Sequence, residues 1–385
     1  MRLSPLHGRV LTTLVCLQQL GQVSAASFNL VKDYSGSTFF DEWDFYGSWD
    51  NLTLGDVNWL DRTNATNEKL AFVNGANNAI LKVDNTTNVI WQNKRDSIRI
   101  TTQKEYAIGT IWIADIVHMP FGCSVWPALW TKGPLWPNDG EIDIIEGINL
   151  MQNNQMALHT QSGCSHVTPA PANQRGTSAQ LDCSIDAGCT VLETAANSYG
   201  AGFNSAGGGV YATQFDATGV YIWFWSRANI PKSISSSTST SALASIDDWG
   251  PPAASYPSGA TCDIGKFFGA QSLVIDITLC GNWAGDPAIY STQCSAQGTT
   301  GKCYDDNVVG AGDKYNEAYF EIKYVRAYSN SDLSSSPTTS SGASATTTGQ
   351  TSVNTTKSGT SAGQALSITF GPMSFMLLAS AFLVI

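Results

Sequence analysis

The chain has 385 residues, of which 43% are hydrophobic and 13% are charged, and this balance predicts a folded protein with a sizeable core. Its formal net charge of −11 leaves no basic footprint for phosphate groups, so we expect no nucleic-acid partner. The low share of charged residues beside 12 Trp and 35 Gly argues against a coiled coil or helical repeat and favours a β protein.

The first 25 residues have the pattern of a secretory signal peptide. Arg2 and Arg9 precede an apolar stretch over 10–20, and the small residues 23–25 follow as a cleavage sequence. The apolar stretch is too short to span a bilayer, which disfavours the alternative of an uncleaved anchor. We therefore predict that residues 1–25 are removed.

Short runs of period-two alternation recur between residues 28 and 328, separated by clusters of Gly, Asn, Asp and Pro. Such runs predict antiparallel strands, because parallel strands would need intervening crossover helices. We expect one all-β domain over 26–330, an antiparallel β-sandwich. Two segments, 162–209 and 232–257, lack the alternation and are interpreted as long loops, held in part by disulfides. The clearest predicted strands are 79–83, 97–101, 109–117, 210–215, 220–227, 272–278 and 318–328.

A cluster of three acids lies in the sequence Glu141-Ile-Asp-Ile-Ile-Glu146. The Ile residues favour a strand with one buried face, so the acids would project from the other face. Strict alternation would separate Glu146 from Glu141 and Asp143, and a single-residue bulge between them restores Glu146 to the acidic face. A helix fits worse, because Glu141 and Glu146 would diverge by roughly 140°.

Three adjacent carboxyl groups repel one another when ionised, and this repulsion can give two of them different protonation states and therefore different roles. One Glu is ionised and nucleophilic while another is kept protonated by the charge beside it. Two carboxyl groups roughly 5 to 5.5 Å apart constitute a retaining glycosidase, and strand curvature would have to bring them this close. A calcium site or a solvated acidic edge is the alternative, although calcium usually needs further carbonyl ligands and a flexible loop.

Three tryptophans, Trp126, Trp130 and Trp136, flank the acids. Sugars offer C–H faces to aromatic rings, so we predict that these side chains bind a saccharide. Plain core packing is the alternative for each of them.

His159 follows the acids in what reads as the next strand. If 149–154 is the hairpin loop, antiparallel pairing places His159 opposite about position 144, beside Asp143. There the imidazole would bond Asp143 or a sugar hydroxyl, with a structural histidine as the alternative.

The C-terminal end changes composition. Over 331–365 more than half of the residues are Ser or Thr, which predicts an unfolded, O-glycosylated stalk. The apolar, uncharged segment 366–385 lies beyond the small residues Ser358, Gly359 and Ser361. This is the pattern of a glycosylphosphatidylinositol (GPI) signal, whose tail is removed. The alternative, a tail-anchored helix, would normally need flanking charges.

Cysteine usage agrees with secretion. Cys16 leaves with the signal peptide, and the remaining eight cysteines are an even number suited to four disulfides. No Cys/His spacing suggests zinc, and we expect neither a metal nor a cofactor. The eight are Cys123, Cys164, Cys183, Cys189, Cys262, Cys280, Cys294 and Cys303. Predicted N-glycosylation sites are Asn51, Asn64, Asn85 and Asn354.

The acidic motif resembles that of family 16 glycoside hydrolases. Glu141-Ile-Asp-Ile-Ile-Glu146 is similar to their E-x-D-x-x-E signature, in the bulged form of laminarinase-like β-1,3(4)-glucanases. The resemblance to fungal members covers residues 28–328. It extends to Phe39-Phe-Asp-Glu-Trp-Asp-Phe-Tyr46, Ser124-Val-Trp-Pro-Ala-Leu-Trp130, Trp136-Pro-Asn-Asp-Gly140 and Asp276-Ile-Thr-Leu-Cys-Gly-Asn-Trp-Ala-Gly285.

The resemblance implies a β-jelly-roll of the concanavalin A-like type, with the substrate in a concave cleft. It implies endo-acting, retaining hydrolysis of β-1,3(4)-glucans, so the expected partner is a β-glucan polysaccharide and 26–330 is the catalytic domain. Glu141 would be the nucleophile, Glu146 the acid/base and Asp143 the assisting acid. The resemblance also agrees with His159 lying beside Asp143, where it would bond Asp143 or a sugar hydroxyl.

Two other functions fit the same residues. A wall-remodelling transglycosylase is favoured somewhat by a lipid anchor, but its wall cross-linking relatives usually have the shorter motif E-x-D-x-E. A non-catalytic glucan-binding lectin would not need all three acids. We expect a monomer at the cell surface, GPI-anchored to the plasma membrane or transferred to the cell wall, with membrane contact only through the lipid.

Overall fold

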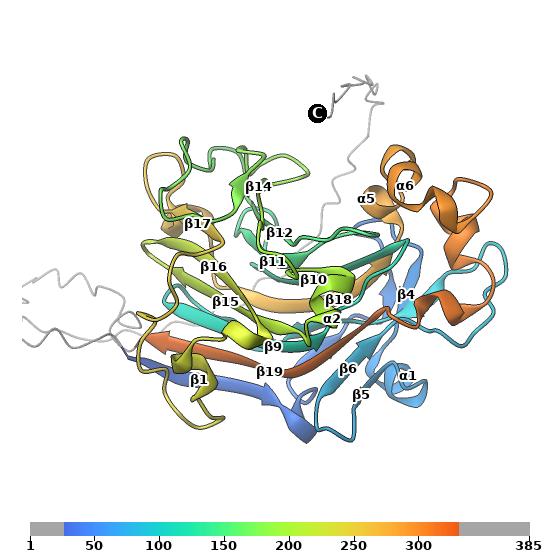
Figure 1. The fold of residues 1–385 in the computed structure, drawn as a ribbon, viewed down its shortest axis with the longest axis horizontal. Helices are drawn as coiled ribbons and strands as arrows, with labels where there is room; N and C mark the ends of the chain where they lie inside the picture. The colour runs from blue at the N-terminus through green and yellow to red at the C-terminus, as the bar shows by residue number, and fades with distance from the viewer. Residues whose placement is uncertain (1–26, 331–385) are drawn as a thin grey trace, which may run out of the picture. The chain divides into compact units, whose positions relative to one another are not determined.

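Two antiparallel β-sheets stacked face to face make up most of the computed structural model, which describes residues 27–330 (Figure 1). The predicted signal peptide, stalk, GPI signal and Asn354 lie outside the described residues. Sheet A has the order β17 (Ala254–Pro257), β16 (Gly219–Ser226), β15 (Gly209–Asp216), β9 (Thr110–His118), β19 (Tyr319–Asn330), β6 (Ala79–Lys82) and β5 (Ala71–Val73), with β1 (Phe28–Ser35) also paired to β19.

Sheet B carries the acidic motif and forms the other layer. Its order is β13 (Thr177–Ser178), β14 (Cys189–Leu192), β12 (Gln155–His159), β11 (Glu141–Glu146), β10 (Val125–Lys132), β18 (Ser272–Leu279), β8 (Arg99–Thr102) and β2 (Trp43–Phe45). A third, three-stranded sheet consists of β3 (Ser48–Trp49), β4 (Val57–Trp59) and β7 (Arg95–Ser97), and in it β4 and β7 are parallel.

Helices are short in the described part of the chain, and none of them is long and apolar enough to cross a membrane. The α-helices are α1 (Arg62–Asn67), α2 (Gly200–Ser205), α3 (Lys232–Ser235), α4 (Ile264–Phe267), α5 (Gly281–Ala284) and α6 (Pro287–Cys294). Single turns of 3₁₀ or π geometry are η1 (Gly36–Thr38), η2 (Arg227–Asn229), η3 (Ser295–Gln297), η4 (Tyr304–Val308) and η5 (Gly312–Tyr315).

The β15–β16 hairpin illustrates how local sequence sets the register. Asp216 pairs with Gly219 across a two-residue turn, and the Asp216 carboxylate accepts a hydrogen bond of 2.7 Å from the Thr218 amide. Short polar side chains and Gly favour such turns because they satisfy or relax the backbone there. With the turn fixed, the alternating residues of both strands fall on matching faces.

The main core lies between the two sheets. Ile142 and Ile145 of β11 belong to the same buried cluster as Trp112 of β9 and Phe215 of β15. Burial of each such side chain contributes about 1.5–3 kcal/mol, so the Ile residues hold β11 on the core. The seven predicted strands are confirmed, with bounds that differ by at most two residues, and so is the antiparallel β-sandwich.

The two segments interpreted as long loops are only partly loops, and this correction bears on the site. The segment 162–209 contributes β13 and β14, which extend sheet B next to β12. The segment 232–257 contributes β17 to sheet A and covers the outer face of that sheet with Ile234, Leu243 and Trp249. Two- and four-residue strands are too short to show an alternation in the sequence.

All eight predicted cysteines form disulfides. Two of the four bonds hold the segment 162–209, as expected for a region with little regular structure. The pairs are Cys123–Cys294, Cys164–Cys262, Cys183–Cys189 and Cys280–Cys303.

Candidate active site

A bulge in β11 brings the three acids to one face. On the β10 side Trp130 pairs with Asp143 and Leu129 pairs with Ile145, so Ile144 has no partner. The ladder to β12 is interrupted between Asp143 and Glu146 as well. The predicted single-residue bulge is therefore confirmed, and it is the device that re-aims the last glutamate.

The Ile residues of β11 lie in the inter-sheet core, which leaves the acids on the outer face of sheet B. Asp143 is 2% exposed, whereas Glu141 and Glu146 are half-buried. Loops from 160–190 rise above one end of this sheet, and α5 and α6 lie beyond its other end (Figure 1). The two glutamates are thus the carboxyl groups that a ligand on this face could reach.

Each predicted tryptophan donates its ring N–H to a carboxylate. Trp126 Nε1 lies 2.9 Å from Glu146 Oε1, and Trp136 Nε1 donates to Glu141 Oε2. Trp130 Nε1 lies 3.0 Å from Oδ2 of another acid, Asp276. Trp126 packs edge-on against Trp283 and is 8% exposed, whereas Trp136 is 58% exposed. Saccharide binding by the three rings stays a prediction.

His159 reaches Asp143, but not through the predicted pairing. It lies opposite Glu141, because the hairpin loop is longer than 149–154 and the bulge shifts the register. Its Nε2 is 3.2 Å from Asp143 Oδ2. This is an ion-pair distance without hydrogen-bond alignment, since Oδ2 has no aligned donor. The imidazole nevertheless lies against the acidic strand.

The three carboxyl groups have raised pKa values, and burial is the first cause for each. Burial and the Asp143 charge raise the pKa of Glu141 to about 8, and burial raises that of Glu146 to about 7. Burial and the Glu146 charge raise the pKa of Asp143 well above its ordinary value. His159 lowers the pKa of both glutamates. Near neutral pH the strand therefore holds protons as well as charges, as acid–base catalysis requires.

A family model described as an XgeA-like, catalytic GH16 domain matches residues 43–328. The chain belongs to glycoside hydrolase family 16. Over 331 residues, 82% of this chain and 68% of the relative, it is 36% identical to an endo-1,3(4)-β-glucanase of Arthroderma benhamiae.

Two solved structures of the family resemble this fold. Laminarinase 16A of Phanerochaete chrysosporium, with β-glucans in its donor and acceptor sites, matches with a TM-score of 0.72 and 35% identity. An elongating family 16 β-1,3-glucosyltransferase matches with a TM-score of 0.69 and 37% identity. Each match covers 79% of this chain and 100% of the other. The jelly-roll sandwich is the shared fold.

The family 16 site contains two charged residues that the motif did not reveal. Asp276 and Glu146 pair with Ala128 from opposite sides, so both acids lie in one row across sheet B, and Arg99 continues the row. Arg99 Nη1 lies 3.4 Å from Asp276 Oδ2, and its guanidinium packs over the Trp130 ring. A single acid, Asp276, within the otherwise apolar run 273–277 was the available signal.

Glu141, Asp143 and His159 are also the described residues that could hold a metal, with ligand atoms within 4.8 Å of one another. A cation would need these carboxyl groups ionised and the imidazole neutral. Burial and mutual repulsion instead raise the pKa values of Glu141 and Asp143, which favours their protonated forms. Protons therefore compete with any cation for this cluster near neutral pH.

The three glycosylation sites within the described residues lie at the surface or close to it. Asn51 and Asn64 are exposed, and Asn85 is half-buried. Asn51 Oδ1 accepts a hydrogen bond of 2.7 Å from the Tyr46 hydroxyl, which leaves its Nδ2 free for a glycan. Glycosylation of these residues stays a prediction.

Proposed function

We propose that this family 16 domain is an endo-acting β-1,3(4)-glucanase that works with retention of configuration. The observation that carries the proposal is the bulge at Ile144, which lets Glu141, Asp143 and Glu146 share one face. The likeness to an endo-1,3(4)-β-glucanase and to a laminarinase supports the substrate class.

The proposed reaction has two displacements. In the first, Glu146 protonates the glycosidic oxygen while the Glu141 carboxylate attacks the anomeric carbon and forms a glycosyl ester. In the second, ionised Glu146 removes a proton from water, which attacks the anomeric carbon and releases Glu141. Asp143 lies between them, and its charge raises the pKa of Glu141.

Without substrate, the pKa of Glu141 lies above that of Glu146, and bound substrate has to reverse this order. Values of about 8 for Glu141 and about 7 for Glu146 leave the last proton on Glu141, whereas the first displacement needs it on Glu146. The groups interact, so they titrate as a unit that shares its protons. A glycosidic oxygen against Glu146 would accept a hydrogen bond and so favour protonated Glu146. The roles of Glu141 as nucleophile and Glu146 as acid/base therefore rest on their places as the first and last acids of the family 16 motif.

The substrate class is tested with purified protein on laminarin, lichenan, cellulose and xylan. We expect new reducing ends and mid-length products from laminarin or lichenan, and a first-formed product with the β-anomeric NMR signal. Activity on xylan alone would overturn the substrate class, and a first-formed α-anomer would overturn retention.

A glucan transglycosylase is the second candidate, and the likeness to an elongating β-1,3-glucosyltransferase favours it. In that reaction a sugar hydroxyl replaces water in the second displacement. Incubation with a short laminari-oligosaccharide separates the two functions. Products longer than the donor, formed at low donor concentration, would establish transfer as the main reaction, whereas shorter products alone would exclude it.

We also propose secretion and a GPI anchor, so that the domain meets β-glucan at the cell surface or in the wall. The support is the sequence of 1–25 and 331–385 alone. Release from intact cells by phosphatidylinositol-specific phospholipase C is the expected result. Retention of an uncleaved C-terminal segment in the mature protein, read by mass spectrometry, would contradict the anchor.

A further inference from the structure

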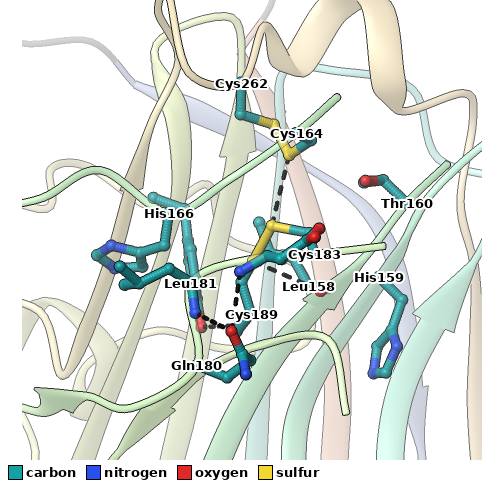
Figure 2. Close-up of a disulfide and its surroundings, with 12 residues drawn as sticks. Leu158, His159, Thr160, Cys164, His166, Gln180, Leu181, Cys183, Cys189 and Cys262 are labelled. Atoms are coloured by element: carbon teal, nitrogen blue, oxygen red, sulfur yellow. Dashed lines mark hydrogen bonds between the residues drawn. A yellow bond between two sulfur atoms is a disulfide. The ribbon is translucent and has the colours of Figure 1, made fainter. Parts of the chain in front are cut away.

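The short loop closed by the Cys183–Cys189 disulfide packs against His159. Cys189 opens β14 and pairs with Leu158, while the Thr160 amide donates a hydrogen bond of 2.9 Å to the Cys183 carbonyl. The two ends of the loop are therefore fixed to the residues before and after His159. Figure 2 shows Cys183 and Cys189 beside Leu158, with His159 next along the strand.

A second disulfide anchors the same loop. The Cys183 amide donates to the Cys164 carbonyl at 3.2 Å, and the Sγ atoms of Cys164 and Cys183 are 3.5 Å apart (Figure 2). Cys164 is in turn bonded to Cys262. The loop is thus tied to two separate parts of the chain, and its backbone has little freedom to move away from β12.

Gly188 is the residue of this loop that faces the imidazole. It has a φ of +64°, and an added Cβ would lie 2.8 Å from His159 Nε2 and 2.6 Å from the Leu158 carbonyl oxygen. Real Cβ atoms do not approach this closely, so only glycine fits between the loop and the ring. The same Nε2 atom lies 3.2 Å from Asp143 Oδ2.

We propose that Gly188, held in place by the Cys183–Cys189 disulfide, is a positioning residue that leaves the space in which the His159 imidazole lies against Asp143. The proposal rests on the proposed function for its effect on turnover, but the contact it describes does not. A ring pushed away from β11 would no longer favour the ionised forms of Glu141 and Glu146. A misplacement of about 1 Å in an active site costs on the order of 100-fold in rate.

The test compares Gly188→Ala with Gly250→Ala in the full chain. Gly250 has nearly the same backbone strain, with a φ of +67°, but an added Cβ there would meet nothing within 4 Å. We expect kcat on laminarin to fall about 10- to 100-fold in Gly188→Ala, with KM within about two-fold. Gly250→Ala should behave as the wild type.

The pH profile distinguishes positioning from a structural effect. The titratable groups that face His159 are Glu141, Asp143 and Glu146 on β11, and Lys132 and Asp276 lie on the neighbouring strands. Displacement of the imidazole in Gly188→Ala should raise the pKa of both glutamates, so both limbs of the kcat/KM profile should move to higher pH. Profiles of Gly188→Ala and Gly250→Ala that coincide would overturn the proposal.

Two further measurements cover misfolding and inactivity. The double variant Cys183→Ser/Cys189→Ser opens the loop without adding an atom near the ring, and it should shift the profile in the same direction. The imidazole NMR signals of His159, assigned by their loss in His159→Gln, should move in Gly188→Ala but not in Gly250→Ala. Unmoved signals refute the positioning contact. If the His159 signals move in Gly188→Ala but the wild-type protein is inactive on all glucans, the proposed function alone is refuted.

Discussion

Trp126 Nε1 donates a hydrogen bond of 2.9 Å to Glu146 Oε1, and this bond favours the ionised form of the carboxyl group. In Trp126→Phe the ring remains but the donor is lost, so the pKa of Glu146 should rise above about 7. We expect the alkaline limb of the kcat profile, which reports Glu146 in the substrate complex, to move up by about 0.5–1 pH unit. Trp223→Phe, which loses a comparable bond to the Gly250 carbonyl on sheet A, is the control. If the alkaline limb moved equally in Trp126→Phe and Trp223→Phe, the effect of the Trp126 hydrogen bond on the pKa of Glu146 would be refuted.

Asp276→Asn should displace the same limb in the opposite direction. The Asp276 charge raises the pKa of Glu146 and of Asp143 across the row on sheet B. Without that charge the alkaline limb should fall to lower pH. Arg99 is buried and loses its carboxylate partner, so we also expect a loss of about 1–3 kcal/mol in the free energy of unfolding. Urea titration beside the pH profile checks both, and an unmoved limb would remove Asp276 from the site.

Glu141→Gln and Glu146→Gln should each lower kcat on laminarin by at least about 10³-fold, because each removes an ionisable group that the proposed chemical steps use. Glu42→Gln is the matched control, since Glu42 is exposed and pairs with Lys32. A Glu141→Gln protein with full turnover would leave a glucan-binding module rather than an enzyme. Far-UV circular dichroism confirms that the inactive variants are folded.

Glu141→Gln should also stabilise the protein at alkaline pH. The folded-state pKa of Glu141 is about 8, above its ordinary value of 4.5, so the folded protein binds the proton more tightly than the unfolded chain. The contribution of Glu141 to stability is therefore greatest below about pH 4.5 and is lost as pH rises through 8. Because its side chain is half-buried, we expect a gain on the order of 1–3 kcal/mol for Glu141→Gln at pH 8.5 relative to pH 5. Equal differences from wild type at both pH values would contradict this.

Features that depend on the local alternation of apolar and polar residues could be predicted from the sequence. Contacts between segments that are far apart in the chain could not. The bulge could be foreseen, because alternation alone puts Glu146 on the wrong face of a strand that otherwise buries Ile. The register of His159 could not, because it depends on a hairpin loop whose length has no sequence signature. The partnership of Arg99 with Asp276 joins β8 to β18, two strands far apart in the chain.

The short strands escaped notice for a different reason. β13 and β14 have two and four residues, which is too few for a period to appear, and β14 is defined by its pairing with β12. Gly188 looked like any loop glycine, although its conformation places it against a predicted site residue. Packing of a loop on a strand is a tertiary property, and only the structure exposes it.

Ile144, the unpaired residue of β11, gives the acidic motif an unusual tolerance to length changes. If it were deleted, the acids would occupy the first, third and fifth positions of an unbroken strand and would still face the same side. The five- and six-residue forms of the motif are therefore two solutions to one geometric problem. A single codon deletion can therefore convert one form into the other without turning an acid of the motif into the core.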